Sequence, residues 1–314
     1  MTSNEFDWIS HEIRKSLPSE ILSVERINQG RNSSCSKVIL ESVNVALKDY
    51  SSSPDAKARF LRESFTLKLI SSLEILNAPE IVALDYQNYQ IATKFIEGKC
   101  PHEINSNFLD SLSIFIGELN SDHVKLNSSP LSRDAYIGEF DVFVDIKQRC
   151  SSISPKASLS VFKDSYTAVY DCFRRFILKN PSKVKEVKKA FSLANSISFF
   201  SPSDVGIHNS IENEQGFFFV DFEYAGIDNP LKMLFDLLVN PSNQINSWEL
   251  INQNENIFQN YLSMLTSKQT VYFHFLFMIK WYLILLNNIL RQKPDYKLIE
   301  NLILLESKIR NFNA

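Results

Sequence analysis

Two short segments carry the strongest signal in this sequence, FSPSDVGIHN at residues 200–209 and VDFE at residues 220–223. Within them, Asp204 and Asn209 are separated by four residues, and Asp221 follows Asn209 by twelve positions. Carboxylate and amide oxygens are the ligands that a hard cation such as Mg²⁺ accepts. Because Asp and Asn are also common in turns and helix caps, the D-x-x-x-x-N pattern needs support from its surroundings.

That support comes from the residues between the two segments. Turn residues at 213–216 and the apolar run 217–220 predict a hairpin whose second strand leads into Asp221. Phosphoryl transfer requires a group that orients the attacking hydroxyl and oxygen ligands that hold magnesium against the phosphates. Kinase catalytic loops have the same Asp-to-Asn separation and a second metal-binding Asp after a hairpin. We therefore predict that Asp204 orients an acceptor hydroxyl and that Asn209 and Asp221 bind Mg²⁺ beside ATP.

A lysine and a glutamate upstream fit the same chemistry. Lys48 ends the run Val45-Ala46-Leu47-Lys48, which is close to the V-A-I-K pattern in which a strand lysine contacts nucleotide phosphates. Glu63 lies on the helix predicted next and is the natural partner of Lys48. Taken singly, each would be an ordinary solvated side chain. Their order and the elements that carry them favour a role in nucleotide binding.

The turn at residues 29–34, QGRNSS, precedes the second predicted strand. Through backbone amides and small hydroxyls it could fold over phosphates, which makes Gly30, Ser33 and Ser34 candidate nucleotide-binding residues. A plain hairpin turn explains the same residues nearly as well, because the turn contains a single glycine. The loop is consistent with nucleotide binding without requiring it.

The pattern of apolar residues changes near Gly98. Before it, we predict an antiparallel meander with one helix, and after it long helical runs interrupted by residues 197–225. The predicted strands cover parts of 21–50, 81–85 and 89–95. The predicted helices cover 55–76, 107–124, 133–149, 159–178 and 182–194, and further helices are predicted after 225. We therefore predict a nucleotide-binding lobe at 1–98 and a helical lobe with the catalytic loop and substrate pocket at 99–314.

Composition bounds the cellular setting and the partners. The chain has 314 residues, of which 44% are hydrophobic, and a net charge of -3, which indicates a large core and no electrostatic footprint for nucleic acid or an anionic membrane. Its four cysteines form no C-x-x-C pair, so neither zinc nor a disulfide framework is indicated. The polar, early acidic N-terminus fits no signal or transit peptide. We expect a cytoplasmic protein; its oligomeric state is left open.

The most apolar stretch covers residues 272–290 and is long enough for a membrane helix to be considered. It contains His274, Lys280, Asn287 and Asn288, which would be costly at membrane depth. A helix buried within a large helical lobe accepts such residues near its ends or on one face. We therefore predict a buried helix and no membrane partner.

The sequence resembles the aminoglycoside phosphotransferase and choline kinase group of small-molecule kinases over most of its length. The resemblance is strongest at 203–209 and at VDFEYAG, residues 220–226. It implies that the backbone of Lys94 and Ile96, in an interlobe hinge, meets adenine, and that Glu223 assists through a second metal ion. The usual His-Gly or His-Asn before the catalytic Asp is replaced by Pro202-Ser203, which suggests a divergent branch.

The resemblance also implies roles for residues near these motifs. Asp228 and Asp236 occupy positions where the family has acidic residues, and Asp236 would hydrogen-bond backbone amides of the catalytic loop. His208 is a candidate acid or base, although a loop histidine bonded to backbone is the commoner role.

The fold class expected is therefore α+β, a bilobal protein-kinase-like fold with a small antiparallel-sheet lobe carrying one helix and a larger, mainly helical lobe. The function expected is ATP- and Mg²⁺-dependent phosphorylation of a hydroxyl on a small molecule such as a sugar, amino alcohol or aminoglycoside-like compound. The alternative is a nucleotide-binding pseudokinase or scaffold, which the complete set of motif residues disfavours. A protein kinase is disfavoured because little room for a peptide-docking segment follows Asp221. The sequence does not identify the acceptor, nor ATP over GTP.

Overall fold

A computed structural model describes residues 8–29, 32–121, 129–243, 257–291 and 296–312 of the chain. The chain divides into two compact units made of noncontiguous segments. The first unit comprises 1–102, 107–133 and 200–227, and the second comprises 103–106, 134–199 and 228–314. The lobe boundary near Gly98 stays a prediction.

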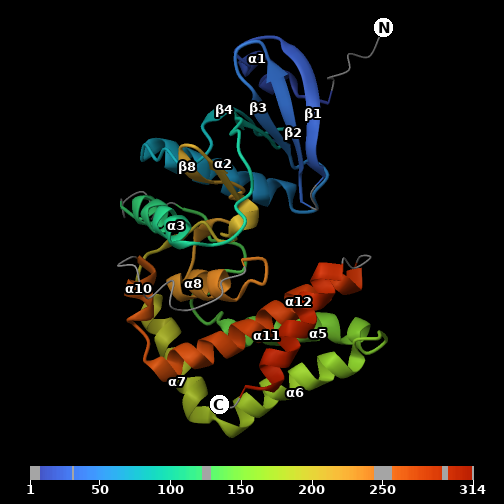
Figure 1. Cartoon of the computed structure of the whole chain (residues 1–314), viewed down its shortest axis with the longest axis vertical. Helices are drawn as coiled ribbons and strands as arrows, with labels where there is room; N and C mark the ends of the chain where they lie inside the picture. Colours follow the sequence, from blue (N-terminus) through green and yellow to red (C-terminus); the bar gives the residue numbers. More distant parts are fainter. Residues whose placement is uncertain (1–7, 30–31, 122–128, 244–256, 292–295, 313–314) are drawn as a thin grey trace. The chain divides into compact units, whose positions relative to one another are not determined.

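The first unit contains a five-stranded antiparallel sheet in the order β1-β2-β3-β5-β4 (Figure 1). Its strands are β1 (Ile21–Gln29), β2 (Ser34–Leu40), β3 (Val45–Asp49), β4 (Ile81–Asp85) and β5 (Gln90–Lys94). Two helices accompany the sheet, α1 (His11–Ser16) and α2 (Ala56–Ser72). The sheet and α2 match the expected elements, whereas α1 was not predicted; it has six residues, too few to show a helical period, and Ser10 caps it.

Alternation along β3 places Lys48. Val45 and Leu47 are buried in the core that α1 shares with the sheet. Because successive side chains of a strand point to opposite faces, Lys48 projects from the other face of the sheet. The registers with β2 and β5 pair Lys48 with Cys35 and Ile91.

The remaining part of the first unit carries the motif segments. These elements are α3 (Ser106–Leu119), β6 (Phe200–Ser201), the 3₁₀ turn η1 (Ile207–Asn209), β7 (Ser210–Asn213), β8 (Gly216–Phe219) and β9 (Gly226–Ile227). The predicted hairpin is present as β7 and β8, and Phe219 is buried against Phe115 of α3 with ring centroids 4.9 Å apart. Phe222 packs on the same ring at 5.9 Å. These aromatic contacts anchor the chain on both sides of Asp221.

The second unit is helical. It consists of α5 (Val142–Ala157), α6 (Lys163–Lys179), α7 (Pro181–Ala194), α8 (Pro230–Val239), α10 (Ile257–Leu262), α11 (Ser267–Arg291) and α12 (Tyr296–Arg310). The long helix α11 packs against α5, α6, α7, α8 and α12. By length and composition α11 could cross a membrane, but 67% of its most apolar window is buried inside the protein. This burial agrees with the expected core helix.

One predicted helix is misplaced. The run 133–149 was expected to be helical, but α5 begins at Val142, where the Asp141 side chain caps it by accepting from the amides of Phe143 and Val144. Upstream, Asp134 and Gly138 have positive φ angles of 55° and 66°. Such angles are incompatible with a right-handed helix, so the segment before Asp141 is irregular.

Candidate active site

The first unit brings Lys48, Glu63 and Asp221 together. The Lys48 Nζ donates hydrogen bonds to Glu63 Oε2 and to Asp221 Oδ1, and both N···O distances are 2.7 Å. Burial alone would lower the pKa of Lys48, but the charges of Asp221 and Glu63 raise it well above its ordinary value. The ammonium of Lys48 is therefore charged. It is shared between Glu63 on α2 and Asp221, which follows strand β8.

Tyr50 is a member of this cluster that the sequence did not indicate. Its hydroxyl donates to Glu63 Oε2, the same oxygen that accepts from Lys48. The ring is fully buried, and burial together with the charge of Glu63 raises the pKa of Tyr50 well above its ordinary value. Tyr50 thus remains a neutral donor that holds Glu63 in place. A tyrosine two residues after a strand lysine is the only signal that could have pointed to it.

Asp221 and Glu223 differ sharply in exposure. The Asp221 side chain is 38% exposed and its φ angle is 64°, a left-handed conformation that a non-glycine residue adopts at a cost. Glu223 is 2% exposed, and its Oε1 accepts from Arg59 Nη1 at 2.6 Å and from Asn32 Nδ2 at 2.7 Å. Burial and the charge of Asp221 raise the pKa of Glu223, while Lys48 and Arg59 oppose the rise.

Backbone and side-chain bonds fix the loop that carries Asp204. Ser203 has a φ angle of 70°, and its amide donates to the Ser201 hydroxyl at 2.9 Å. The Asn209 Nδ2 donates to the Asp204 carbonyl at 2.8 Å, and the Asn209 carbonyl accepts from the Val220 amide at 3.0 Å. Because the nitrogen of the amide side chain is directed to the loop, its oxygen Oδ1 is the end available to a cation.

His208 contacts the carboxylate of Asp204. The His208 Nε2 lies 3.3 Å from Asp204 Oδ1, and both side chains are about one-third exposed. Burial alone would lower the pKa of His208, but the hydrogen bond to Asp204 and the charges of Asp204 and Asp221 raise it. The bond seen for this ring therefore goes to a carboxylate and not to the backbone that the sequence favoured.

Lys94 and Ile96, the predicted hinge residues, lie where strand β5 ends. The Lys94 amide donates to the Glu80 carbonyl at 2.8 Å, and Ile96 is half-buried in the irregular segment that follows. Gly98 has a φ angle of 157°, and a Cβ there would come within 2.5 Å of Ile211 and 2.6 Å of the Glu212 carbonyl. Only glycine fits this close approach of the backbone at residue 98 to β7.

The candidate residues of the β1–β2 turn are only partly described. Ser33 is half-buried, and Ser34 begins β2 opposite Asp49. Gly30 lies outside the described residues. Asn32, which was not predicted, connects this turn to the segment after β8, because its Nδ2 donates to Glu223 Oε1 and to the hydroxyl of Tyr224, the latter at 2.8 Å. The nucleotide role of the turn stays a prediction.

The donor set fits magnesium. Glu223 Oε2 is buried and has no hydrogen-bond partner among the described residues. In the same cluster Glu63, Asp221 and Glu223 face two cations, Lys48 and Arg59, so one carboxylate charge is in excess. Within the described ranges no group of three or more His, Cys, Asp or Glu side chains is arranged to hold a metal alone. Mg²⁺ commonly needs only one or two carboxylates, because substrate phosphates and water complete its shell.

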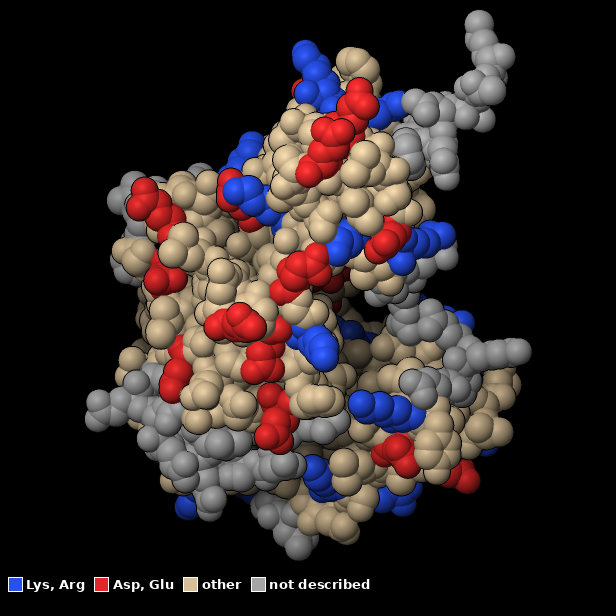
Figure 2. Space-filling model, turned by 45° about the horizontal axis from the view of Figure 1, so that its top comes forward, with Lys and Arg blue, Asp and Glu red and all other residues tan. Residues whose placement is uncertain are grey.

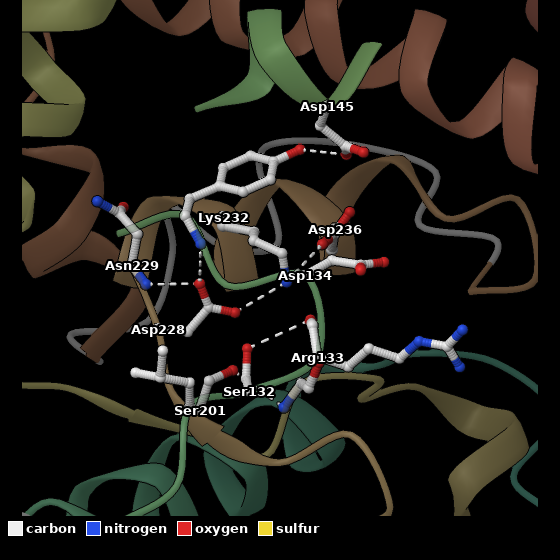
Figure 3. A network of polar contacts seen from close by, with 12 residues as sticks. Ser132, Arg133, Asp134, Asp145, Ser201, Asp228, Asn229, Lys232 and Asp236 are labelled. Carbon is white, nitrogen blue, oxygen red and sulfur yellow. Dashed lines mark hydrogen bonds and ion pairs between the residues drawn. The ribbon is translucent and has the colours of Figure 1, made fainter. Parts of the chain in front are cut away.

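The second unit holds a different polar network, of which Figure 3 labels Asp228, Lys232 and Asp236. Lys232 donates to Asp228 at 2.8 Å and lies 3.6 Å from Asp236. Both carboxylate oxygens of Asp236 accept from Lys280, at 2.6 and 2.7 Å, and Trp281 Nε1 donates to it at 3.1 Å. These bonds differ from the catalytic-loop contacts implied for Asp236. They tie α8 to α11 within the second unit.

Charged side chains of both signs lie next to one another on the face drawn in Figure 2. The expected lack of a nucleic-acid partner stays a prediction.

The comparisons with known proteins concern structure. No protein-family model matches the sequence, and no curated protein matches it. The chain is similar to the crystal structure of choline kinase LicA from Streptococcus pneumoniae, at 15% identity and a TM-score of 0.60, over 99% of this chain and 100% of that one. It is also similar to choline kinase from Cryptosporidium parvum, at 17% identity and a TM-score of 0.58, over 94% and 92% of the two chains.

A third similar structure is the streptomycin–ATP–APH(2")-IIa ternary complex, at 13% identity and a TM-score of 0.57, over 99% of this chain and 100% of that one. Choline kinases and aminoglycoside phosphotransferases are thus both among the similar structures. The α+β protein-kinase-like fold expected from the sequence is confirmed. At these identities the likeness establishes the fold, and function is argued from the site.

Proposed function

We propose that the chain is an ATP- and Mg²⁺-dependent phosphotransferase that moves the γ-phosphate to a hydroxyl of a small molecule. The observation that carries the proposal is Lys48, which bridges Glu63 and Asp221 at 2.7 Å on each side. A lysine held in this way can turn its charge to the α- and β-phosphates, as the corresponding lysine does in kinases. The three residues come from different elements, and Asp221 is 173 residues from Lys48 in sequence, so a chance ion pair is a weaker explanation.

The roles of the remaining residues follow from their contacts. The cation would be held by Asn209 Oδ1, Asp221 and Glu223 Oε2, the last of which has no hydrogen-bond partner in the described part of the chain. When bound, Mg²⁺ neutralises charge on the phosphates and aligns them for transfer. Asp204 has a carboxylate that is about one-third exposed, on a loop held by hydrogen bonds at Ser203 and Asn209, and it would accept the hydrogen bond of the acceptor hydroxyl and orient the attacking oxygen.

The proposal extends to the nucleotide base and to the acceptor. The backbone of Lys94 and Ile96 would meet adenine, and Ser33, Ser34 and Gly30 would lie over the phosphates. Related structures were solved with AMP and with streptomycin and ATP, which supports nucleotide binding in this fold. Hydroxylated small molecules such as amino alcohols, sugars and aminoglycosides are the acceptor classes to test.

An ATP-consumption screen tests the proposal. Purified protein with Mg²⁺ and ATP is presented with hydroxylated amines, sugars and aminoglycosides, and ADP release is measured with Asp221→Ala as the inactive control. We expect acceptor-dependent ADP release by the wild type alone. Tight binding of Mg-ATP with no transfer to any acceptor would favour the pseudokinase. Absence of nucleotide binding would refute the proposal.

A further inference from the structure

Arg59 and Glu63 lie one helical turn apart on α2, so both side chains leave the helix on the same face. Arg59 and Glu63 are connected to opposite ends of the segment 221–223. Glu63 reaches Asp221 through Lys48, and Arg59 donates directly to Glu223 Oε1 at 2.6 Å. Both ends of the proposed metal segment are therefore connected to α2.

Contacts at Glu223 distinguish its two oxygens. Oε1 accepts from Arg59 and from Asn32, whereas Oε2 is buried and accepts no hydrogen bond within the described residues. An unpartnered buried carboxylate oxygen costs more than about 1–3 kcal/mol, so it is expected where a ligand completes its surroundings. Two donors on one oxygen fix the carboxylate and leave the other oxygen for a cation.

Arg59 is itself held rigidly. Its side chain is 5% exposed, and its guanidinium lies 4.9 Å from the centre of the Tyr224 ring. Asp55 Oδ2 lies 3.8 Å from Arg59 Nη2, one turn earlier on the chain. A planar guanidinium fixed by stacking and by a second carboxylate has little freedom, so it can define the orientation of Glu223.

We propose that Arg59 is a positioning residue that orients the Glu223 carboxylate so that its Oε2 can bind the cation of the nucleotide complex. This inference rests on the proposed function. The competing explanation is a structural ion pair that only fastens α2 to the metal segment. The positioning role and the structural ion pair predict different effects on cation binding, because a guanidinium repels a nearby divalent cation. Loss of a purely structural counter-ion would leave cation binding unchanged or tighter, whereas loss of a positioning group would weaken it.

Manganese binding is the direct test, with Mn²⁺ standing in for Mg²⁺. Electron paramagnetic resonance would measure the Mn²⁺ affinity of the protein–ADP complex for the wild type, Arg59→Met and Arg59→Lys. Lys57→Met is the matched control, since Lys57 is exposed on the same turn of α2 and carries the same charge. We expect Arg59→Met to raise the Mn²⁺ Kd about 10- to 100-fold, as loss of groups that orient metal ligands does, with metal-free ADP affinity unchanged.

The conservative variant and the control sharpen the result. Arg59→Lys keeps the charge but lacks the planar fork, so it should recover part of the lost affinity. Lys57→Met should bind Mn²⁺ like the wild type. An unchanged or lower Mn²⁺ Kd in Arg59→Met would overturn the proposal.

A second pair of variants covers the case in which Arg59→Met fails to fold, because it leaves Glu223 buried without its cation. The double variant Arg59→Met/Glu223→Gln removes both charges together. If Arg59 acts through Glu223, the double variant should bind Mn²⁺ no more weakly than Glu223→Gln alone. Additive losses would contradict positioning through Glu223. Normal Mn²⁺ binding by the wild type with an unchanged Mn²⁺ Kd in Arg59→Met would refute the inference alone, whereas a wild type whose ADP complex binds no Mn²⁺ would refute the metal site of the proposed function as well.

Discussion

Two clusters of lysines and carboxylates can be compared in this molecule, one in each unit. The cluster of the second unit contains Lys232 and Lys280 with Asp228 and Asp236, and all four lie in or next to α8 and α11. Each lysine has an aspartate at 2.8 Å or less, and both oxygens of Asp236 are occupied by donors. Charge is balanced there, and the bonds join neighbouring helices.

The cluster of the first unit is not balanced. Lys48 serves two carboxylates, Asp221 is partly exposed in a left-handed conformation, and Glu223 keeps one buried oxygen without a partner in the described part of the chain. Strain and unsatisfied polar atoms of this kind are typical of functional sites. The difference supports a stabilising role for the second cluster and the proposed cation-binding role for the first.

The largest effect expected is on turnover. Asp204→Asn keeps the shape of the side chain and removes its charge, so kcat should fall by about two to four orders of magnitude while Mg-ATP affinity stays near that of the wild type. Steady-state kinetics with an acceptor from the screen, together with calorimetric titration, would measure both. Asp171→Asn, at an exposed site on α6, is the control and should be unaffected. An unchanged kcat in Asp204→Asn would remove Asp204 from the mechanism.

Substitutions in the cluster of the second unit should lower the stability of the fold. Lys280→Met leaves the carboxylate of Asp236, which is 15% exposed, with a more distant lysine, Lys232, at 3.6 Å, and we expect the free energy of unfolding to fall by about 3 kcal/mol. Urea unfolding measures this loss. Lys268→Met removes an exposed lysine from the same helix and should change stability by less than about 0.5 kcal/mol. Equal stability of the two variants would show that the cluster is not a structural support.

A smaller effect concerns pH and His274 on α11. Burial, and then the charge of Lys308, lowers the pKa of His274 to about 4. The unfolded state then binds more protons than the folded state between about pH 4 and 6.5, so this contribution is present above pH 6.5 and lost as pH falls. We expect it to account for about 2 kcal/mol of lost stability between pH 7 and pH 5. His274→Gln should lose less over that range, and identical pH profiles would contradict the expectation.

Much of the sheet and the pairing of Lys48 with Glu63 could be predicted from sequence, because strand alternation and motif spacing are local signals. Arg59 could not, since its partner Glu223 is 164 residues away and helical periodicity does not mark a buried charge. Asp236 was misjudged for a related reason. Its partner Lys280 lies 44 residues further on, in a helix whose apolar pattern gave no hint of an ion pair.

The helix expected at 133–149 shows a further limit of periodicity. The helical spacing of apolar residues extends upstream of Val142, where α5 begins. The backbone at Asp134 and Gly138 has positive φ angles that a helix does not allow, and the cap at Asp141 sets the helix boundary. Capping residues and glycines were therefore better guides to this boundary than the apolar spacing.

Calorimetric titration of ATP with and without Mg²⁺, for the wild type and Asp221→Ala, tests the central claim most directly. If Asp221 holds a cation that bridges the phosphates, Mg²⁺ will strengthen ATP binding by the wild type, and this gain will be absent in Asp221→Ala. Thermal melting of both proteins would show that each is folded. Binding of Mg-ATP by Asp221→Ala as tightly as by the wild type would contradict the account of this site.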